Sequence, residues 1–140
     1  MTTDNTTMNT GPAAAAVVSS VFEAFANRDL VAISDLFHDD ATWNHRNDDR
    51  LGGLHHGSDG VVAFMTEAAQ LTGGTLRPVP QSFMADGEGH VAVLVQVSGT
   101  RPDGRSFDNP QIVLFTLDGR RVRTVDQFVG DPAAVTAFWA

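Results

Sequence analysis

Hydrophobic residues in the first half of the chain recur at helical spacing. Val17, Val21 and Phe25 follow one another at i, i+4 and i+8, so they share one face of a helix. Asp29 and Ser58, both typical N-cap residues, stand directly before two further runs of this kind. The pattern predicts three helices, over about residues 13–27, 30–38 and 58–72.

From Leu76 onward, hydrophobic and polar residues alternate with a period of two. Turn sequences such as Asp118 and Gly119 separate the alternating segments and favour short hairpins. The alternation predicts an antiparallel meander of four strands, at about residues 76–85, 90–100, 106–117 and 121–129. A short strand is also expected at about residues 41–45, followed by a polar connection.

Taken together, these elements predict an α+β fold, with helices on the concave face of a curved antiparallel sheet. Such an arrangement forms a cone, and its inside is the expected pocket for a ligand. A closing helix is expected to begin at Asp131 and Pro132. We expect one domain over residues 13–140, preceded by a disordered lead-in over residues 1–12.

The composition narrows the classes of partner. Asp and Glu outnumber Lys and Arg by 17 to 9, which gives a net charge of −8 and argues against nucleic acid or an anionic membrane as a partner. Cysteine is absent, so no disulfide, thiolate nucleophile or cysteine metal site is possible. The sequence has no basic leader and no apolar run of membrane-spanning length, and the expected location is the cytoplasm.

Asp126 is the strongest candidate for chemistry. In a regular strand one face carries Val122, Thr124, Asp126 and Phe128, and the other carries Arg121, Arg123, Val125 and Gln127. If the arginines mark the wetter face, Asp126 points into the cavity, where a carboxylate could take and return a proton. The alternative is a structural acid that is satisfied by a backbone amide or an arginine.

His45 is the expected partner of Asp126. It shares one face of the short strand with Trp43, and an imidazole beside a carboxylate is a common acid–base pair. We expect the polar atoms of His45 and Asp126 to lie within direct or one-water reach. The alternative is a strand-end histidine bonded near solvent. Trp43 and Phe128 are expected to form part of the cavity wall.

Several polar residues are candidate ligand contacts, and no metal motif is present. The candidate contacts are His56, Gln96, Asn109 and Gln111. The histidines at 38, 45, 55 and 56, with Asp48 or Asp49, match no metal-binding spacing, and residues 46–50 are expected to form a solvated loop. We therefore expect neither a metal nor a cofactor.

The order of the elements, with residues 39–43, Gly57 and residues 126–128, resembles the nuclear-transport-factor-2-like (NTF2-like) superfamily, and within it the SnoaL-like polyketide cyclase branch. The resemblance covers about residues 13–139. It implies a cone-shaped fold and an acid–base role for Asp126. It also matches Trp43 and His45 to the positions where the related epoxide hydrolases hold the attacking water.

Two departures narrow the activity that the resemblance implies. Residues 93–98 lack the Arg and the second Asp of the epoxide hydrolases, and the chain has no Tyr, on which ketosteroid isomerases rely. We therefore expect a cofactor-independent enzyme of secondary metabolism, which catalyses cyclisation, isomerisation or elimination by proton transfer. Its substrate would be an apolar carbonyl compound or a polycyclic metabolite.

Two alternatives remain open. One is a non-catalytic protein that binds a small molecule or acts as a scaffold, and the other is water addition of the epoxide-hydrolase type. Because a meander leaves one sheet face free, we also expect a homodimer.

Overall fold

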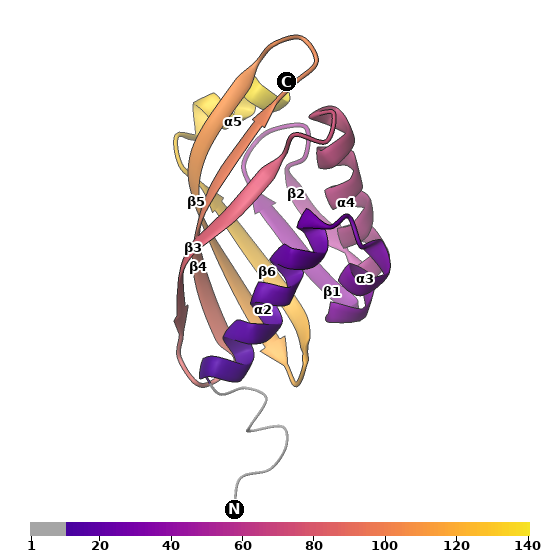
Figure 1. The fold of residues 1–140 in the computed structure, drawn as a ribbon, viewed down its shortest axis with the longest axis vertical. Coiled ribbons are helices and arrows are strands. Elements are labelled where there is room, and N and C mark those ends of the chain that lie inside the picture. The colour runs from indigo at the N-terminus through magenta and orange to yellow at the C-terminus, as the bar shows by residue number, and fades with distance from the viewer. Residues whose placement is uncertain (1–10) are drawn as a thin grey trace, which may run out of the picture.

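The computed structural model describes residues 11–140, so most of the predicted lead-in, residues 1–10, lies outside the described part of the chain (Figure 1). The helices are α2 (Gly11–Ala26), α3 (Leu30–Leu36), α4 (Gly57–Leu71) and α5 (Pro132–Trp139). The strands are β1 (Phe37–Arg46), β2 (Gly53–His56), β3 (Arg77–Ala85), β4 (His90–Thr100), β5 (Ser106–Asp118) and β6 (Arg121–Val129). Helix α2 begins at Gly11, two residues before the predicted start of the domain.

The strands form one sheet in the order β2-β1-β6-β5-β4-β3. Strands β3 to β6 make the predicted antiparallel meander. Strand β1 is longer than expected and lies parallel to β6, so the sheet is not antiparallel throughout. Strand β2, which falls in the predicted polar connection, adds an antiparallel edge next to β1.

Local chemistry explains where several elements begin. The side chain of Asp29 accepts a hydrogen bond from the backbone N–H of Ala32 at 3.1 Å, which caps α3. Asp131 caps α5 in the same way through Ala134, and Pro132 takes the first helical position. Gly119 has a φ of 65° in the turn between β5 and β6, a conformation that glycine adopts without strain.

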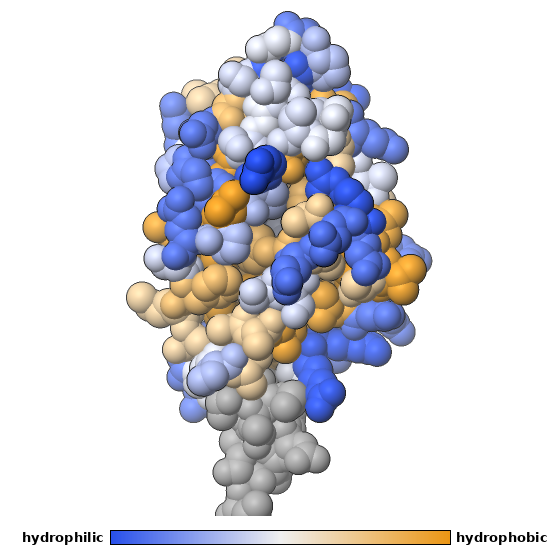
Figure 2. Space-filling model, viewed as in Figure 1, coloured by the Kyte–Doolittle hydropathy of each residue, from blue (hydrophilic) through white to orange (hydrophobic). Residues whose placement is uncertain are grey.

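The helices cover the concave face of the sheet and enclose the core (Figure 1). Alternate residues of β4, namely Val91, Val93, Val95 and Val97, point into this core. On the side where α2 crosses the sheet, hydrophobic and hydrophilic side chains are mixed at the surface (Figure 2). No helix within residues 11–140 combines the length and the apolar character needed to cross a membrane. The architecture confirms the predicted α+β cone.

Strand β6 contains a bulge that changes the predicted faces. Thr124 pairs with Thr116 of β5, but Val122 pairs with Leu117, so Arg123 is an extra residue on β6. Val122 and Val125 are therefore both buried, although they lie three positions apart. Beyond the bulge the inward positions are 125 and 127 rather than 124 and 126. The predicted alternation of β6 is wrong from Arg123 onward.

Candidate functional site

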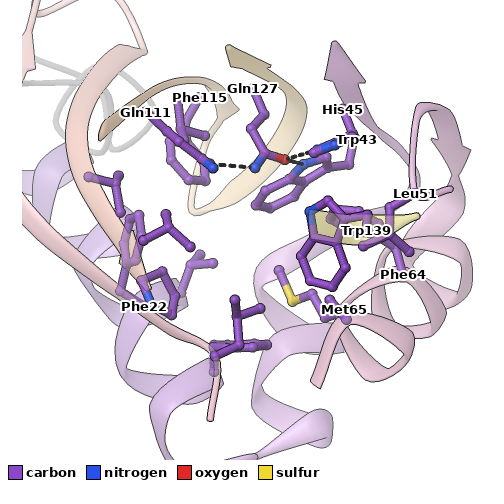
Figure 3. A pocket seen from close by; sticks show the side chains of 18 of the residues that line it. Phe22, Trp43, His45, Leu51, Phe64, Met65, Gln111, Phe115, Gln127 and Trp139 are labelled. Atoms are coloured by element: carbon purple, nitrogen blue, oxygen red, sulfur yellow. Dashed lines mark hydrogen bonds between the residues drawn. The ribbon is translucent and has the colours of Figure 1, made fainter. Parts of the chain in front are cut away.

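A cavity of about 90 Å³ lies between the concave face of the sheet and the helices (Figure 3). A water molecule needs about 10–15 Å³ of such free space, so the cavity corresponds to roughly six to nine waters. Much of its wall is apolar and includes Phe22, Phe64, Met65, Val95, Phe115 and Trp139. The side chains with polar atoms that line it are Trp43, His45, Gln111 and Gln127. This is the apolar pocket with few polar groups that is typical of small-molecule sites.

His45 and Asp49 form a buried pair at the edge of this cavity. The Nε2 atom of His45 lies 2.8 Å from Oδ2 of Asp49. Their side chains are 2% and 0% exposed, respectively. Strand β1 places His45 on the inward face with Trp43, as the alternation predicted. The turn that follows β1 brings Asp49 back over the imidazole.

Asp49 is held in its ionised form by its neighbours. Burial alone raises the pKa of Asp49, but hydrogen bonds from His45 and Asn47, the positive charge of His45 and the backbone N–H of Leu51 together lower it below the ordinary 3.8. The amide of Asn47 donates to Oδ2 at 2.6 Å, and the N–H of Leu51 donates to Oδ1 at 2.8 Å. The carboxylate is therefore a fixed acceptor for His45 Nε2–H.

A row of side-chain amides continues from the other nitrogen of His45. His45 Nδ1 lies 3.0 Å from Oε1 of Gln127, and Gln127 Nε2 donates to Oε1 of Gln111 at 2.7 Å (Figure 3). Gln111 Nε2 lies 3.3 Å from Oδ1 of Asn109. Asn109 Nδ2 donates to the carbonyl oxygen of Gly130 at 2.6 Å. The row thus links His45 on β1 to the backbone at the end of β6.

The two ends of this row fix the direction of every hydrogen bond in it. The backbone carbonyl of Gly130 can only accept, and the indole N–H of Trp43, 2.9 Å from Gln127 Oε1, can only donate. The amide oxygen of Gln127 must therefore face Trp43 and His45. His45 Nδ1 then donates to this oxygen, and Nε2 donates to Asp49. These partners assign a proton to both ring nitrogens, which is the cationic form of histidine.

Asp126 does not face the cavity, and this prediction is wrong. The bulge at Arg123 turns Gln127 inward and Asp126 outward. Asp126 instead accepts a hydrogen bond from Nε of Arg46 at 2.8 Å on the outer face of the sheet. This contact agrees with the alternative given above, in which Asp126 is a structural acid paired with an arginine. The expected approach of Asp126 to His45 is absent for the same reason.

The other candidate contacts are divided between the two faces of the sheet. Gln111 lines the cavity, and Asn109 is buried behind it. Gln96 lies on the outer face, where its amide donates to Asp108 at 2.8 Å. Phe128 is 45% exposed and His56 is also exposed, so neither belongs to the cavity wall. None of these three side chains lines this cavity, so the structure gives no support to their predicted contacts with a ligand in it.

Asp49 and Gln127 belong to the site although the sequence pattern did not indicate them. Asp49 falls in the segment expected to be a solvated loop, but its i+4 spacing from His45 was a usable signal. Regular alternation of β6 would place Gln127 on the outer face, and the bulge reverses this. Within residues 11–140, no group of three or more His, Asp or Glu side chains is arranged to hold a metal ion.

Comparison with known proteins identifies the family. Residues 18–125 match the SnoaL-like domain. The uncharacterized protein Rv0034 of Mycobacterium tuberculosis (strain H37Rv) is 29% identical over 124 residues, which cover 89% of this chain and 94% of that protein. Among solved structures, Bal32a from a soil-derived mobile gene cassette superposes with a TM-score of 0.89 at 24% identity, over 93% of this chain and 98% of that one. TerC, co-crystallized with polyporic acid, has a TM-score of 0.78 at 20% identity, over 91% and 98% of the two chains. The chain belongs to the SnoaL-like domain family and has the NTF2-like fold.

Proposed function

We propose that this protein is an enzyme that catalyses proton transfer on a small, mostly apolar carbonyl compound without a cofactor. The observation that carries the proposal is the His45–Asp49 pair, which is excluded from solvent yet opens onto an apolar cavity. An ion pair in the core does not by itself favour stability, because desolvation of the two charges opposes their attraction. Its place at a cavity wall is therefore an indication of function.

The two nitrogens of His45 have different roles in this proposal. Nε2–H remains bonded to Asp49, which orients the ring and stabilises its charge. Nδ1 first gives its proton to the carbonyl oxygen of the substrate, which leaves this nitrogen neutral with a free lone pair. It then removes a proton from the carbon next to the carbonyl, so the substrate becomes its enol and His45 regains its charge. A single nitrogen can remove a proton from one atom of a substrate and return it to another, which is sufficient for isomerisation, elimination or the proton steps of a cyclisation.

The cavity also limits the substrate. Space for roughly six to nine waters suits a compact compound with one or two small rings better than a polycyclic one. The wall offers few hydrogen-bonding groups, so most of the ligand surface would be apolar. The fold neighbour TerC was co-crystallized with polyporic acid, and this observation supports a small organic ligand for this chain as well.

Hydrogen exchange at carbon provides a test that needs no knowledge of the natural substrate. A small cyclic enone, 2-cyclohexenone, is incubated with the protein in D₂O, and deuterium entering next to the carbonyl is followed by NMR. We expect exchange above the buffer rate, reduced about 10²-fold or more in His45→Gln. Asp49→Asn is expected to show a smaller loss, and Asp126→Asn serves as the matched control. Exchange that is unaffected by His45→Gln would contradict the proposal.

One observation favours the alternative of a non-catalytic binding protein. Both nitrogens of His45 are already bonded to the protein, so neither is free for a substrate in this state. The same experiment separates the two functions, because a binding protein would take up the enone without exchanging its protons. Water addition is less well supported, since none of the cavity-lining residues is a carboxylic acid and Asp49 lies behind His45.

A further inference from the structure

Two hydrogen-bond donors converge on a single oxygen atom at the polar end of the cavity. Trp43 Nε1 and His45 Nδ1 lie 2.9 and 3.0 Å from Oε1 of Gln127 (Figure 3). Both donors come from β1, two residues apart, and the oxygen comes from β6. Paired donors aimed at one point are the arrangement that stabilises a carbonyl oxygen or an oxyanion in many enzymes.

The two donors are rigidly held without help from Gln127. The indole of Trp43 packs against Phe37, Phe64 and Phe115, with ring centroids 6.2, 5.6 and 6.0 Å away. The imidazole of His45 is anchored by Asp49. Such donors are positioned before a ligand arrives, so the donors themselves need not move to bind an oxygen.

Gln127 is the adaptable member of this group. Its carbonyl oxygen accepts hydrogen bonds from the two donors, and its amide nitrogen donates to Gln111. A glutamine side chain has several rotatable bonds, whereas the indole and imidazole rings are fixed by packing and by Asp49. The amide oxygen can therefore leave the donors when the side chain rotates. Because Oε1 and Nε2 belong to one planar group, the hydrogen bond from Nε2 to Gln111 is given up at the same time.

We propose that Trp43 and His45 form a binding site for a ligand carbonyl or enolate oxygen, and that the carbonyl of Gln127 occupies this site until a ligand displaces it. The inference rests on the proposed function only in taking this cavity as the ligand site. A ligand carbonyl restores both hydrogen bonds of the donors, so the cost of the exchange is that of moving the Gln127 amide, which gives up its hydrogen bond to Gln111. The positive charge of His45 favours an anionic oxygen over a neutral one.

This arrangement selects for the chemical class of the ligand. A hydrocarbon of the same shape cannot satisfy the donors, so it must either leave Gln127 in place or bury two unpaired N–H groups. A ketone, an enone or a phenolate can replace the amide oxygen directly. The site therefore favours ligands with one acceptor oxygen at the end of an apolar body over hydrocarbons of the same shape.

The test compares cyclohexanone with methylenecyclohexane, which has the same shape but carries CH₂ in place of the oxygen. Affinities are measured by NMR titration for the wild-type protein, Trp43→Phe, Gln127→Ala and the outer-face control Asp126→Asn. The C=O stretching frequency of bound ¹³C-labelled cyclohexanone is recorded by infrared spectroscopy. The spectroscopic measurement on the wild-type protein does not depend on whether the variants fold.

We expect Gln127→Ala to strengthen binding of the ketone relative to the alkene, and Trp43→Phe to weaken it by about tenfold, the scale of one hydrogen bond. The C=O band of the bound ketone should lie at lower frequency in the wild-type protein than in Trp43→Phe. An unchanged ketone-to-alkene ratio in Gln127→Ala, or a bound ketone with the C=O frequency of an apolar solvent, would overturn the inference.

The outcomes also separate this inference from the proposed function. Deuterium exchange that depends on His45, together with a C=O band that shows no hydrogen bonding, would refute the oxygen site and leave the enzymatic proposal standing. A strongly shifted C=O band without any exchange would support the oxygen site and overturn the enzymatic proposal.

Discussion

His45 Nε2 and Asp49 Oδ2 lie 2.8 Å apart with neither side chain in contact with bulk solvent. The pair joins two residues only four positions apart, one near the end of β1 and one in the turn after it. Asn47 donates to the same carboxylate oxygen as His45, and the backbone N–H of Leu51 donates to the other. The turn is therefore built around Asp49, and its structure and the orientation of His45 depend on the same carboxylate.

Replacement of Asp49 by Asn should destabilise the fold. Asn cannot carry the negative charge, so the cationic ring of His45 would lose its buried partner, a change that costs about 3 kcal/mol. Urea unfolding at pH 7 measures the loss. Asp48→Asn is the matched control, because the adjacent Asp48 is exposed and its substitution should change the free energy of unfolding by less than about 0.5 kcal/mol. Equal losses in the two variants would contradict the structural role of Asp49.

The lowered pKa of Asp49 predicts a specific dependence of stability on acid pH. A carboxyl group with a folded-state pKa below its unfolded value of about 3.8 binds fewer protons when folded, so its stabilisation is fully present above that value. The stabilisation is lost as the pH falls through the lower folded-state pKa. The difference in unfolding free energy between the wild-type protein and Asp49→Asn should therefore shrink as the pH falls below about 3.8. If this difference in unfolding free energy grew below that pH, the pKa of Asp49 would be raised on folding and not lowered.

Substitution of Asp126 by Asn should have little effect. The side chains of Arg46 and Asp126 are 49% and 31% exposed, and such surface pairs contribute about 0–1 kcal/mol and are weakened by salt. The free energy of unfolding of Asp126→Asn should therefore lie within about 1 kcal/mol of the wild-type value, with a smaller difference at about 1 M NaCl. Deuterium exchange into 2-cyclohexenone should be unchanged. A large loss of deuterium exchange in this variant would show that Asp126 takes part in catalysis after all.

The outer face of the sheet carries a row of exposed hydrophobic side chains that predicts self-association. Leu94, Ile112 and Phe128 are paired neighbours across β4, β5 and β6, with exposures of 41%, 53% and 45%. Arg46 lies beside Phe128 and pairs with Asp126, so each copy offers both charges next to the apolar row. A two-fold contact places the same patch on both partners, which such a surface can satisfy.

We expect a homodimer through this face, measured by light scattering after gel filtration. Ile112→Glu should produce a monomer that keeps the wild-type near-ultraviolet circular dichroism. Val31→Glu, at a 72% exposed position on α3, is the control and should remain dimeric. A wild-type protein that is monomeric at high micromolar concentration would refute the expectation.

Much of the fold could be predicted from the sequence because its elements are set by local patterns. The change from helical spacing to alternation at Leu76 marks the boundary between the helices and the meander, and caps such as Asp29 mark helix starts. Strand β2 was missed because its four residues include only one aliphatic side chain. It exists through pairing with β1, for example between His55 and Trp43, which no local pattern encodes.

The site was predicted only in part, because one bulge decides which alternate residues of β6 face inward. Trp43 and His45 lie on a regular stretch of β1, and their shared face followed from alternation. The face of Asp126 could not be predicted from alternation. Thr116 pairs with Thr124 and Leu117 pairs with Val122, so Arg123 is an extra residue that shifts the alternation. The spacing of three between Val122 and Val125 was the available signal, since a regular strand cannot bury both.

Deletion of Arg123 tests this account of the site directly. Without Arg123, Val122 and Val125 become two residues apart, and a regular strand would place both of them and Gln127 on the inward face. The deletion removes surface ion pairs from Arg123 to Asp118 and Asp40, at 3.1 and 3.5 Å. The variant should therefore fold, with a loss of about 1–2 kcal/mol in the free energy of unfolding.

Deletion of Asp126 is the matched comparison and should be far more damaging. It leaves the bulge in place but turns Gln127 outward, so the N–H groups of Trp43 and His45 lose their common acceptor, at a cost of about 1–3 kcal/mol for each buried donor. Urea unfolding compares the two deletions, and the NMR signal of the Trp43 indole N–H reports whether the acceptor is present. Two deletions that were equally destabilising would show that the bulge does not set the inward position of Gln127.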